Sequence, residues 1–145
     1  MVNQLPNLNK NLLAWIVLST FFSVNAQERS QQQYWFELVA RDQSFSDSAS
    51  RVGRASAFRE FLGEGSVVFR TGGPKDAQDI YSIDNFQGPE ISWKAHYVDV
   101  SRDGDLGLSA GPLVVIGDED DPGDTWGHLV SIWRKQEVNW QLMAD

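Results

Sequence analysis

The chain has 145 residues, which is the size of one domain, and it carries 12 lysine and arginine residues against 20 aspartate and glutamate residues. The net charge of −8 argues against nucleic acid as a partner, because contacts with phosphates need a basic surface. No cysteine is present, which excludes disulfides, iron–sulfur clusters, thiolate zinc sites and a cysteine nucleophile. Apolar residues make up 41% of the chain, which is enough for a packed core.

The first residues have the pattern of an export signal. Leu12–Val24 is an apolar run that is short for a transmembrane helix but suits the core of a signal peptide. Val24 and Ala26 are the small residues expected before a cleavage site, so we predict a cut after Ala26. The predicted parts are a signal peptide at 1–26 and an exported domain at 27–145, periplasmic or secreted, with no membrane contact after cleavage. An uncleaved anchor and a buried N-terminal helix are the alternatives.

The first half of the predicted domain has helical periodicity. An apolar stripe runs through residues 28–52 with a spacing near 3.6 residues per turn, and Asp42 lies in its middle. We expect Gly53 to end this helix, and Gly63 and Gly65 to end a second, shorter one. Three short segments follow, predicted as a strand, a turn and up to two turns of helix: residues 66–70, 71–74 and 75–83.

From residue 91 onward the periodicity changes to two, which predicts antiparallel strands. Asp103–Gly104 between two apolar runs is a strong hairpin signal, so residues 91–100 should pair with residues 106–116. The remaining segments are predicted as a loop and two further strands: residues 117–127, 128–135 and 140–143. Helices followed by antiparallel strands are typical of an α+β fold.

The hairpin register assigns side chains to two faces of the sheet. Trp93 lies opposite Val114 in this register, and it shares with Tyr97 a face that is apolar except for Asp99. The other face places His96 beside glycine and serine residues. A later strand is apolar on both faces, so both faces of the sheet need a cover. Because the helices can cover only one face, we expect the other to form a homodimer interface.

Two motifs in the second half of the chain carry a resemblance to a known family. They are the hairpin Ser101–Gly111 and the segment Gly127–Lys135 with Trp140 after it. On these motifs, residues 39–145 resemble the nuclear transport factor 2-like superfamily, in the branch labelled domain of unknown function 4440. The resemblance implies an α+β fold in which cone-shaped helices pack on a curved antiparallel sheet around an internal cavity, with dimers formed through the sheet. Superfamily members include ketosteroid isomerases, polyketide cyclases and scaffolding subunits, so the resemblance implies no particular reaction.

Five polar residues are candidate catalytic groups. Asp42 ranks first, because a carboxyl group within an apolar stripe is costly unless it is protonated or forms an ion pair, for example with an arginine. Tyr97 could donate a hydrogen bond to a ligand oxygen, and Asp99 is either a functional acid or a cap of the hairpin turn. His96 and His128 are candidate bases or proton shuttles, with surface or interface positions as the alternative.

Apolar residues are expected to line a ligand cavity, since ligand pockets are mostly apolar: Trp35, Leu38, Phe69, Trp93 and Trp133. The alternative for the aromatic residues is a place in the core. We expect no metal site, because the chain has only two histidines and no cysteine, and its acidic loop at 118–124 lacks EF-hand spacing. Neither a glycine-rich phosphate loop nor a dinucleotide motif is present, so we expect no cofactor.

Together these patterns predict an exported domain that binds a small, mostly apolar ligand, with no defined reaction. The first alternative is an acid–base enzyme, such as an isomerase, dehydratase, cyclase or hydrolase, that uses Asp42 with Tyr97, Asp99 or a histidine. The second alternative is a protein-interaction or scaffolding domain. An enzyme needs at least two convergent polar groups in one pocket, whereas a binding protein needs the pocket and one anchor.

Overall fold

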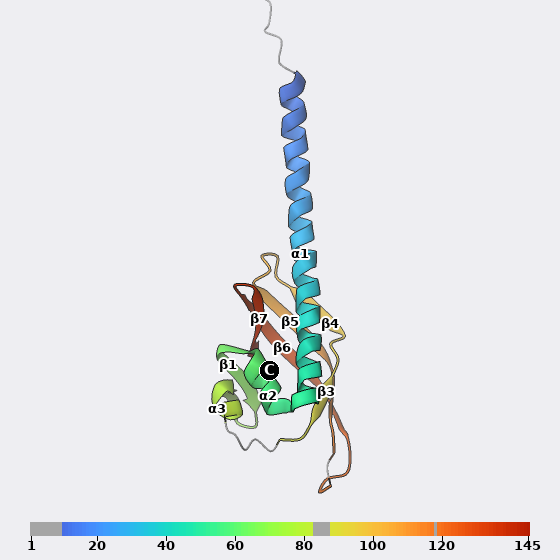
Figure 1. The fold of residues 1–145 in the computed structure, drawn as a ribbon, viewed down its shortest axis with the longest axis vertical. Helices are drawn as coiled ribbons and strands as arrows, with labels where there is room; N and C mark the ends of the chain where they lie inside the picture. Colours follow the sequence, from blue (N-terminus) through green and yellow to red (C-terminus); the bar gives the residue numbers. More distant parts are fainter. Residues whose placement is uncertain (1–9, 83–87, 118) are drawn as a thin grey trace, which may run out of the picture.

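A computed structural model describes residues 10–82, 88–117 and 119–145 of the chain. Its helices are α1 (Lys10–Val52), α2 (Arg54–Phe61) and α3 (Ala77–Ser82) (Figure 1). Helix α1 ends directly before Gly53, as predicted, and the φ of 84° at Gly53 is one that glycine adopts readily.

The predicted signal peptide is covered only in part by the described residues. Residues 1–9 lie outside them, and residues 10–26 continue α1 toward its N-terminus. The helix that the periodicity places at 28–52 therefore begins earlier, at Lys10. No helix in the described part of the chain is long and apolar enough to cross a membrane.

One sheet of seven strands packs against the helices (Figure 1). The strand order is β2-β1-β7-β6-β5-β3, and β4 also pairs with β5. The strands are β1 (Leu62–Arg70), β2 (Gly73–Asp76), β3 (Ile91–Trp93), β4 (Tyr97–Val100), β5 (Leu106–Val115), β6 (Thr125–Gln136) and β7 (Asn139–Ala144). The α+β class is confirmed, but the sheet is mixed rather than antiparallel, because β1 and β7 run parallel. Local periodicity carries no signal for the relative direction of two strands so far apart in the chain.

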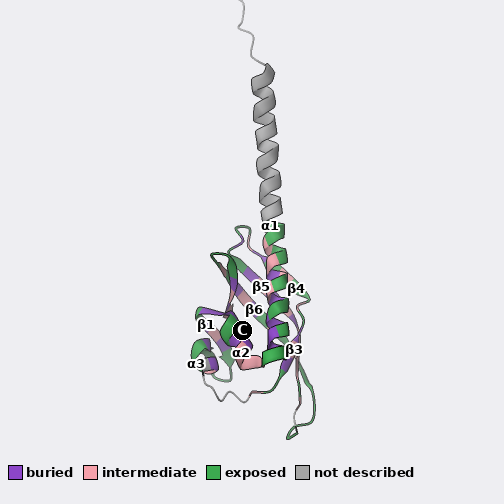
Figure 2. Ribbon diagram, viewed as in Figure 1, coloured by how far each residue is buried: buried purple, intermediate pink, exposed green. Residues whose placement is uncertain are grey.

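An aromatic cluster between the helices and the sheet forms the centre of the core. The ring of Phe45 on α1 lies 4.9 Å from Phe58 and Phe61, 4.7 Å from Trp93 and 5.9 Å from Trp133, centroid to centroid. Such edge-to-face and tilted contacts are favourable for aromatic pairs. Buried and exposed residues alternate along α1 and the strands (Figure 2), so one face of the sheet is turned toward the helices. We call this the inner face and the opposite one the outer face.

The predicted strand at 91–100 is wrong, because the chain makes a β-bulge there and forms two strands. Tyr97 lies opposite Ala110, as expected, but Trp93 lies opposite Leu113 rather than Val114. The bulge arises because His96 also bonds to Ala110, donating its N–H to the Ala110 carbonyl at 2.9 Å. Two residues thus oppose one, and the register shifts by one position.

The bulge decides which side chains enter the core. Trp93 turns to the inner face and is 5% exposed, whereas Tyr97 turns to the outer face and is 57% exposed. The expectation that they share a face is therefore wrong. Gly111 makes the crossing possible, since a Cβ there would lie 2.0 Å from the carbonyl oxygen of Lys94.

Other strand boundaries also differ from the predictions. β1 begins at Leu62 instead of residue 66, and β6 begins at Thr125 within the segment predicted as a loop. Residues 71–72 form the predicted turn, but β2 takes up residues 73–76, which were expected to be the end of that turn and the start of a helix. The glycine, proline, lysine and aspartate of β2 have low strand propensity. Only its pairing with β1 makes it a strand.

Candidate functional site

A buried carboxyl group lies at the centre of the inner face. Asp42 on α1 is 2% exposed, and the Ser109 hydroxyl on β5 donates to its Oδ2 at 2.6 Å. The same hydroxyl oxygen accepts a hydrogen bond from the Trp133 indole on β6 at 2.8 Å. Asp42, Ser109 and Trp133 thus form a buried polar chain that joins the helix to the sheet. Among the described residues, Asp42 forms no ion pair.

The environment of Asp42 favours its protonated form. Burial raises the pKa of Asp42, while the hydrogen bond from Ser109 and the nearby indole of Trp93 lower it less strongly. The Trp93 N–H is buried and lies near enough to Asp42 to lower its pKa as a hydrogen-bond donor, although no described residue gives it a partner of normal geometry. Backbone contact also fixes Trp93, since the Ser46 hydroxyl on α1 donates to its carbonyl oxygen at 2.7 Å. A spare donor therefore lies beside a carboxyl group of raised pKa.

A second carboxyl group, Asp145, lies in the same interior. It follows β7, and the Ser131 hydroxyl on β6 donates to its Oδ1 at 2.8 Å. Burial raises the pKa of Asp145 to about 6, against the opposing effects of Ser131 and two arginines. The negative charge of Asp42 contributes to the increase, so the two carboxyl groups interact. Sequence reasoning missed Asp145 as a site residue, because its partner Ser131 is brought to it by a register shift between β6 and β7 that no local pattern shows.

A tyrosine between two arginines lies near Asp145. Tyr81 on α3 is fully buried, and Arg70 on β1 donates to its hydroxyl oxygen at 2.7 Å. Burial raises the pKa of the Tyr81 hydroxyl, and the charges of Arg54 and Arg70 oppose this increase. The Asp42 and Asp145 carboxyl groups thus interact electrostatically, and Arg54, Arg70 and Tyr81 lie near the second of them.

An open pocket of about 430 Å³ lies between α1 and β4, lined by Gln31, Gln32, Trp35, Asp99 and Val100. The Trp35 indole donates to the Val98 carbonyl oxygen at 2.9 Å, which holds the ring at the edge of the sheet. Trp35 and Asp42 lie on the same side of α1, seven residues or about 10 Å apart. Leu38 lies between them and is fully buried, so it separates the pocket from the Asp42 carboxyl group.

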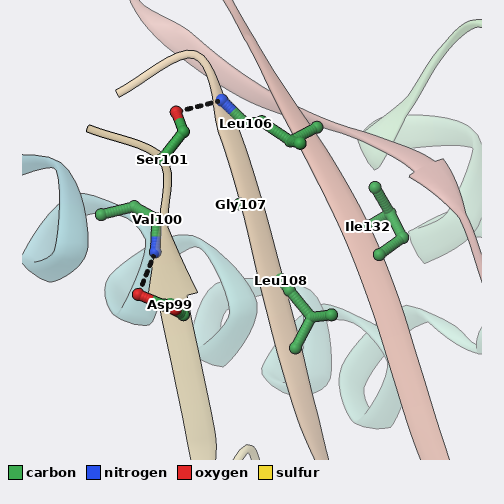
Figure 3. Close-up of a pocket in the computed structure, with 7 residues that line it drawn as sticks. All are labelled: Asp99, Val100, Ser101, Leu106, Gly107, Leu108 and Ile132. Atoms are coloured by element: carbon green, nitrogen blue, oxygen red, sulfur yellow. Dashed lines mark hydrogen bonds between the residues drawn. The ribbon is translucent and has the colours of Figure 1, made fainter. Parts of the chain in front are cut away.

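A second pocket, of about 250 Å³, lies where β4 and β5 meet at the hairpin, and Figure 3 shows its lining. Leu106, Leu108 and Ile132 give it a mostly apolar wall, and Asp99 supplies its carboxylate. Asp99 Oδ1 accepts the Val100 N–H at 2.9 Å, as drawn in Figure 3, and its Oδ2 accepts the Tyr97 hydroxyl at 3.3 Å.

The predicted site residues fall into separate places. Leu38, Asp42, Trp93 and Trp133 meet in the interior, and Trp35 lies at the edge of the open pocket. The remaining ones are exposed and do not lie beside Asp42: Phe69, His96, Tyr97, Asp99 and His128. Within the described ranges, no group of histidine, aspartate and glutamate residues is arranged to hold a metal ion.

Comparison with known proteins defines the fold. No family model matches the chain, and no curated protein matches it. An NTF-2-like protein of unknown function from Shewanella oneidensis superposes with a TM-score of 0.60 at 10% identity, over 75% of this chain and 93% of that one. The association domain of C. elegans CaMKII superposes with a TM-score of 0.57 at 12% identity, over 79% of this chain and 95% of that one. A protein provisionally assigned as a ketosteroid isomerase, from Shewanella frigidimarina, superposes with a TM-score of 0.52 at 17% identity, over 68% of this chain and 84% of that one.

Identities this low establish the fold alone. The chain has the nuclear transport factor 2-like fold, which the solved structures above share although their printed functions differ. The narrower assignment, to the branch labelled domain of unknown function 4440, stays a prediction from the sequence motifs.

Proposed function

We propose that this domain binds a small, mostly apolar molecule that carries an acceptor oxygen, between α1 and the inner face of the sheet. The polar anchors are the carboxyl group of Asp42 and the N–H of Trp93. The observation that carries the proposal is the unpartnered indole donor beside a buried carboxyl group of raised pKa. A protonated carboxyl group and an indole N–H can both donate to one oxygen atom of a ligand.

The free-energy cost of these groups supports a functional role. A buried polar atom without a partner costs about 1–3 kcal/mol, and a buried carboxyl group loses its hydration as well. An apolar side chain at either position would avoid that cost. Buried titratable groups with a shifted pKa are more frequent at functional sites than elsewhere.

The path to the anchors begins at the open pocket beside Trp35. A ligand that enters there meets Leu38 before it reaches Asp42, and Leu38 packs against the backbone of Gly107. The distance from Trp35 to Asp42 along α1 is about 10 Å. A ligand of that length would have to displace Leu38, which is fully buried.

Two other assignments complete the proposal. The apolar run before Ala26 supports export of the domain, and the apolar outer face supports a homodimer. The same outer face favours a second candidate function, that of an interaction or scaffolding domain, since one similar structure is an association domain. The acid–base alternative has less support, because Tyr97, Asp99 and the histidines do not reach Asp42.

Native mass spectrometry of the purified protein tests the proposal. We expect a reproducible added mass of a few hundred daltons, and Trp93→Phe should reduce its occupancy. Trp140→Phe is the matched control, because the Trp140 N–H is also buried without a partner but lies on β7 beside Lys135. A protein without added mass, whose thermal midpoint also does not respond to the aromatic ketone 2-acetonaphthone, would contradict the proposal.

A further inference from the structure

Asp99 on β4 belongs to the walls of two pockets. It lines the open pocket of about 430 Å³ beside α1 and the smaller, mostly apolar pocket of about 250 Å³ at the hairpin. In Figure 3 its carboxylate lies on the side of β4 that faces away from β5. The charged group therefore stands at the edge of the sheet, where the two pockets meet.

Local hydrogen bonds fix the carboxylate there without neutralising its charge. Asp99 Oδ1 accepts the Val100 N–H at 2.9 Å and Oδ2 accepts the Tyr97 hydroxyl at 3.3 Å, and both donors are uncharged. Among the described residues, no basic side chain forms an ion pair with Asp99, and none lines either pocket. Since a carboxylate oxygen accepts more than one hydrogen bond, Asp99 is open to a cation from solution.

An apolar wall begins directly beside this charge. Leu108 on β5 is the register partner of both Asp99 on β4 and Ile132 on β6, so the three residues lie side by side across the sheet. Leu106, two residues away along β5, extends the wall on the same face. A calcium or magnesium ion prefers several oxygen ligands and gains nothing from such a wall. The lining instead suits a cation that carries an apolar part.

The open pocket offers groups that suit the charged end of such a ligand. The Trp35 ring is 37% exposed, and its N–H donates to the Val98 carbonyl oxygen, so the ring is held in place. Aromatic rings attract cations to their faces. Gln31 and Gln32 add amide oxygens, which accept hydrogen bonds from an ammonium group. Because the net charge of −8 also draws cations toward the protein, both pockets favour a positively charged ligand.

We propose that Asp99 anchors a second ligand site, which binds an organic ammonium ion with a carbon chain. The ammonium group pairs with the Asp99 carboxylate at the edge of the sheet, beside Trp35, and the chain lies against Leu106, Leu108 and Ile132. The apolar pocket has room for about eight groups of the size of a water molecule, so a chain of about six to eight carbon atoms fills it.

This site is separate from the ligand site proposed on the inner face. Asp99 shares the outer face with Tyr97, and its ligand is a cation, whereas Asp42 and Trp93 would donate hydrogen bonds to an acceptor oxygen. Failure of either proposal therefore leaves the other intact. Two-dimensional NMR distinguishes them, because each ligand shifts the backbone amide signals around its own site.

Titration with alkylammonium ions, followed by NMR, tests the proposal. Hexylammonium should shift the amide signals of Leu106 and Leu108 in a saturable way. Each methylene added from butylammonium to octylammonium should lower the dissociation constant about two- to fourfold, because it buries further apolar area. The neutral analogue hexan-1-ol has the same chain and should bind more weakly than hexylammonium, since it forms no ion pair with Asp99.

Asp99→Asn tests the ion pair, because asparagine keeps an oxygen that accepts the Val100 N–H but carries no charge. This variant should raise the dissociation constant of hexylammonium about three- to tenfold and leave that of hexan-1-ol unchanged. Asp103→Asn is the matched control, since it removes the same charge from the exposed hairpin turn but lines neither pocket. Because salt screens exposed charges, both constants of the control should stay within about twofold of the wild-type values.

Four outcomes of these titrations would overturn the proposal. They are an absence of saturable shifts, equal affinities for hexylammonium and hexan-1-ol, equal effects of Asp99→Asn and Asp103→Asn, and shifts centred on Asp42 instead of the hairpin.

Discussion

Each face of the sheet carries exceptions to the usual distribution of polar and apolar groups. The inner face buries Asp42, Ser109 and Ser131 among aromatic rings, whereas the outer face leaves Trp126 and Val130 exposed. Buried polar groups and exposed apolar patches are the informative exceptions in a folded protein, and here they lie on opposite sides of the same strands. The buried polar groups lie where we propose the small-molecule site, and the exposed apolar side chains lie where we propose a protein contact.

The bulge at His96 decides which side chains of this segment face the helices. A substitution that disturbs the bulge should therefore have the largest effect on stability. Gly111→Ala should lower the free energy of unfolding by about 3 kcal/mol or more, because its Cβ would meet the Lys94 carbonyl oxygen at 2.0 Å. Gly127→Ala is the control, since a Cβ there meets nothing within 4 Å. Urea unfolding of both variants measures the difference. Equal stability of the two variants would show that the bulge does not need Gly111.

Breaking the hydrogen bonds that join Asp42, Ser109 and Trp133 should have the next largest effect on stability. Ser109→Ala leaves the Asp42 carboxyl group and the Trp133 indole without their common partner, which should cost about 1–3 kcal/mol. The exposed Ser44 on α1 bonds only to the Ala40 carbonyl, so Ser44→Ala should change the unfolding free energy by less than about 0.5 kcal/mol. A small effect of Ser109→Ala would mean that solvent reaches these groups.

The pH dependence of stability offers the smallest effect. Asp145 has a pKa of about 6 in the folded protein against 3.8 in the reference state, so the folded protein holds its proton more tightly. The free energy of unfolding should therefore rise as the pH falls from 7 to 5, by about 1–2 kcal/mol from this group. The raised pKa of Asp42 acts in the same direction.

Asp145→Asn provides the comparison for the pH experiment. Urea unfolding at pH 7 and pH 5 should show a smaller gain in stability for the variant than for the wild-type protein. Identical pH profiles for the wild-type protein and Asp145→Asn would show that another group causes the pH dependence of stability.

Features encoded by neighbouring residues were predictable. The end of α1 at Gly53 follows from glycine's freedom at positive φ, and the pairing of Tyr97 with Ala110 follows from the Asp-Gly turn. The burial of Asp42 also follows from its place in the apolar stripe of one helix. In each case the physical cause acts within a few residues along the chain.

Features that depend on distant segments were not predictable. The bulge at His96 reversed the face of Trp93, and no local pattern distinguishes that strand from a regular one. The partner of Asp42 is Ser109, 67 residues away, and Asp145 is held between Ser131 on β6 and the backbone of β1. Local patterns were enough to predict the fold class, the helix stripe and the hairpin turn. Which polar groups meet depends on the register of distant strands, since a shift of one residue moves a side chain from one face of the sheet to the other.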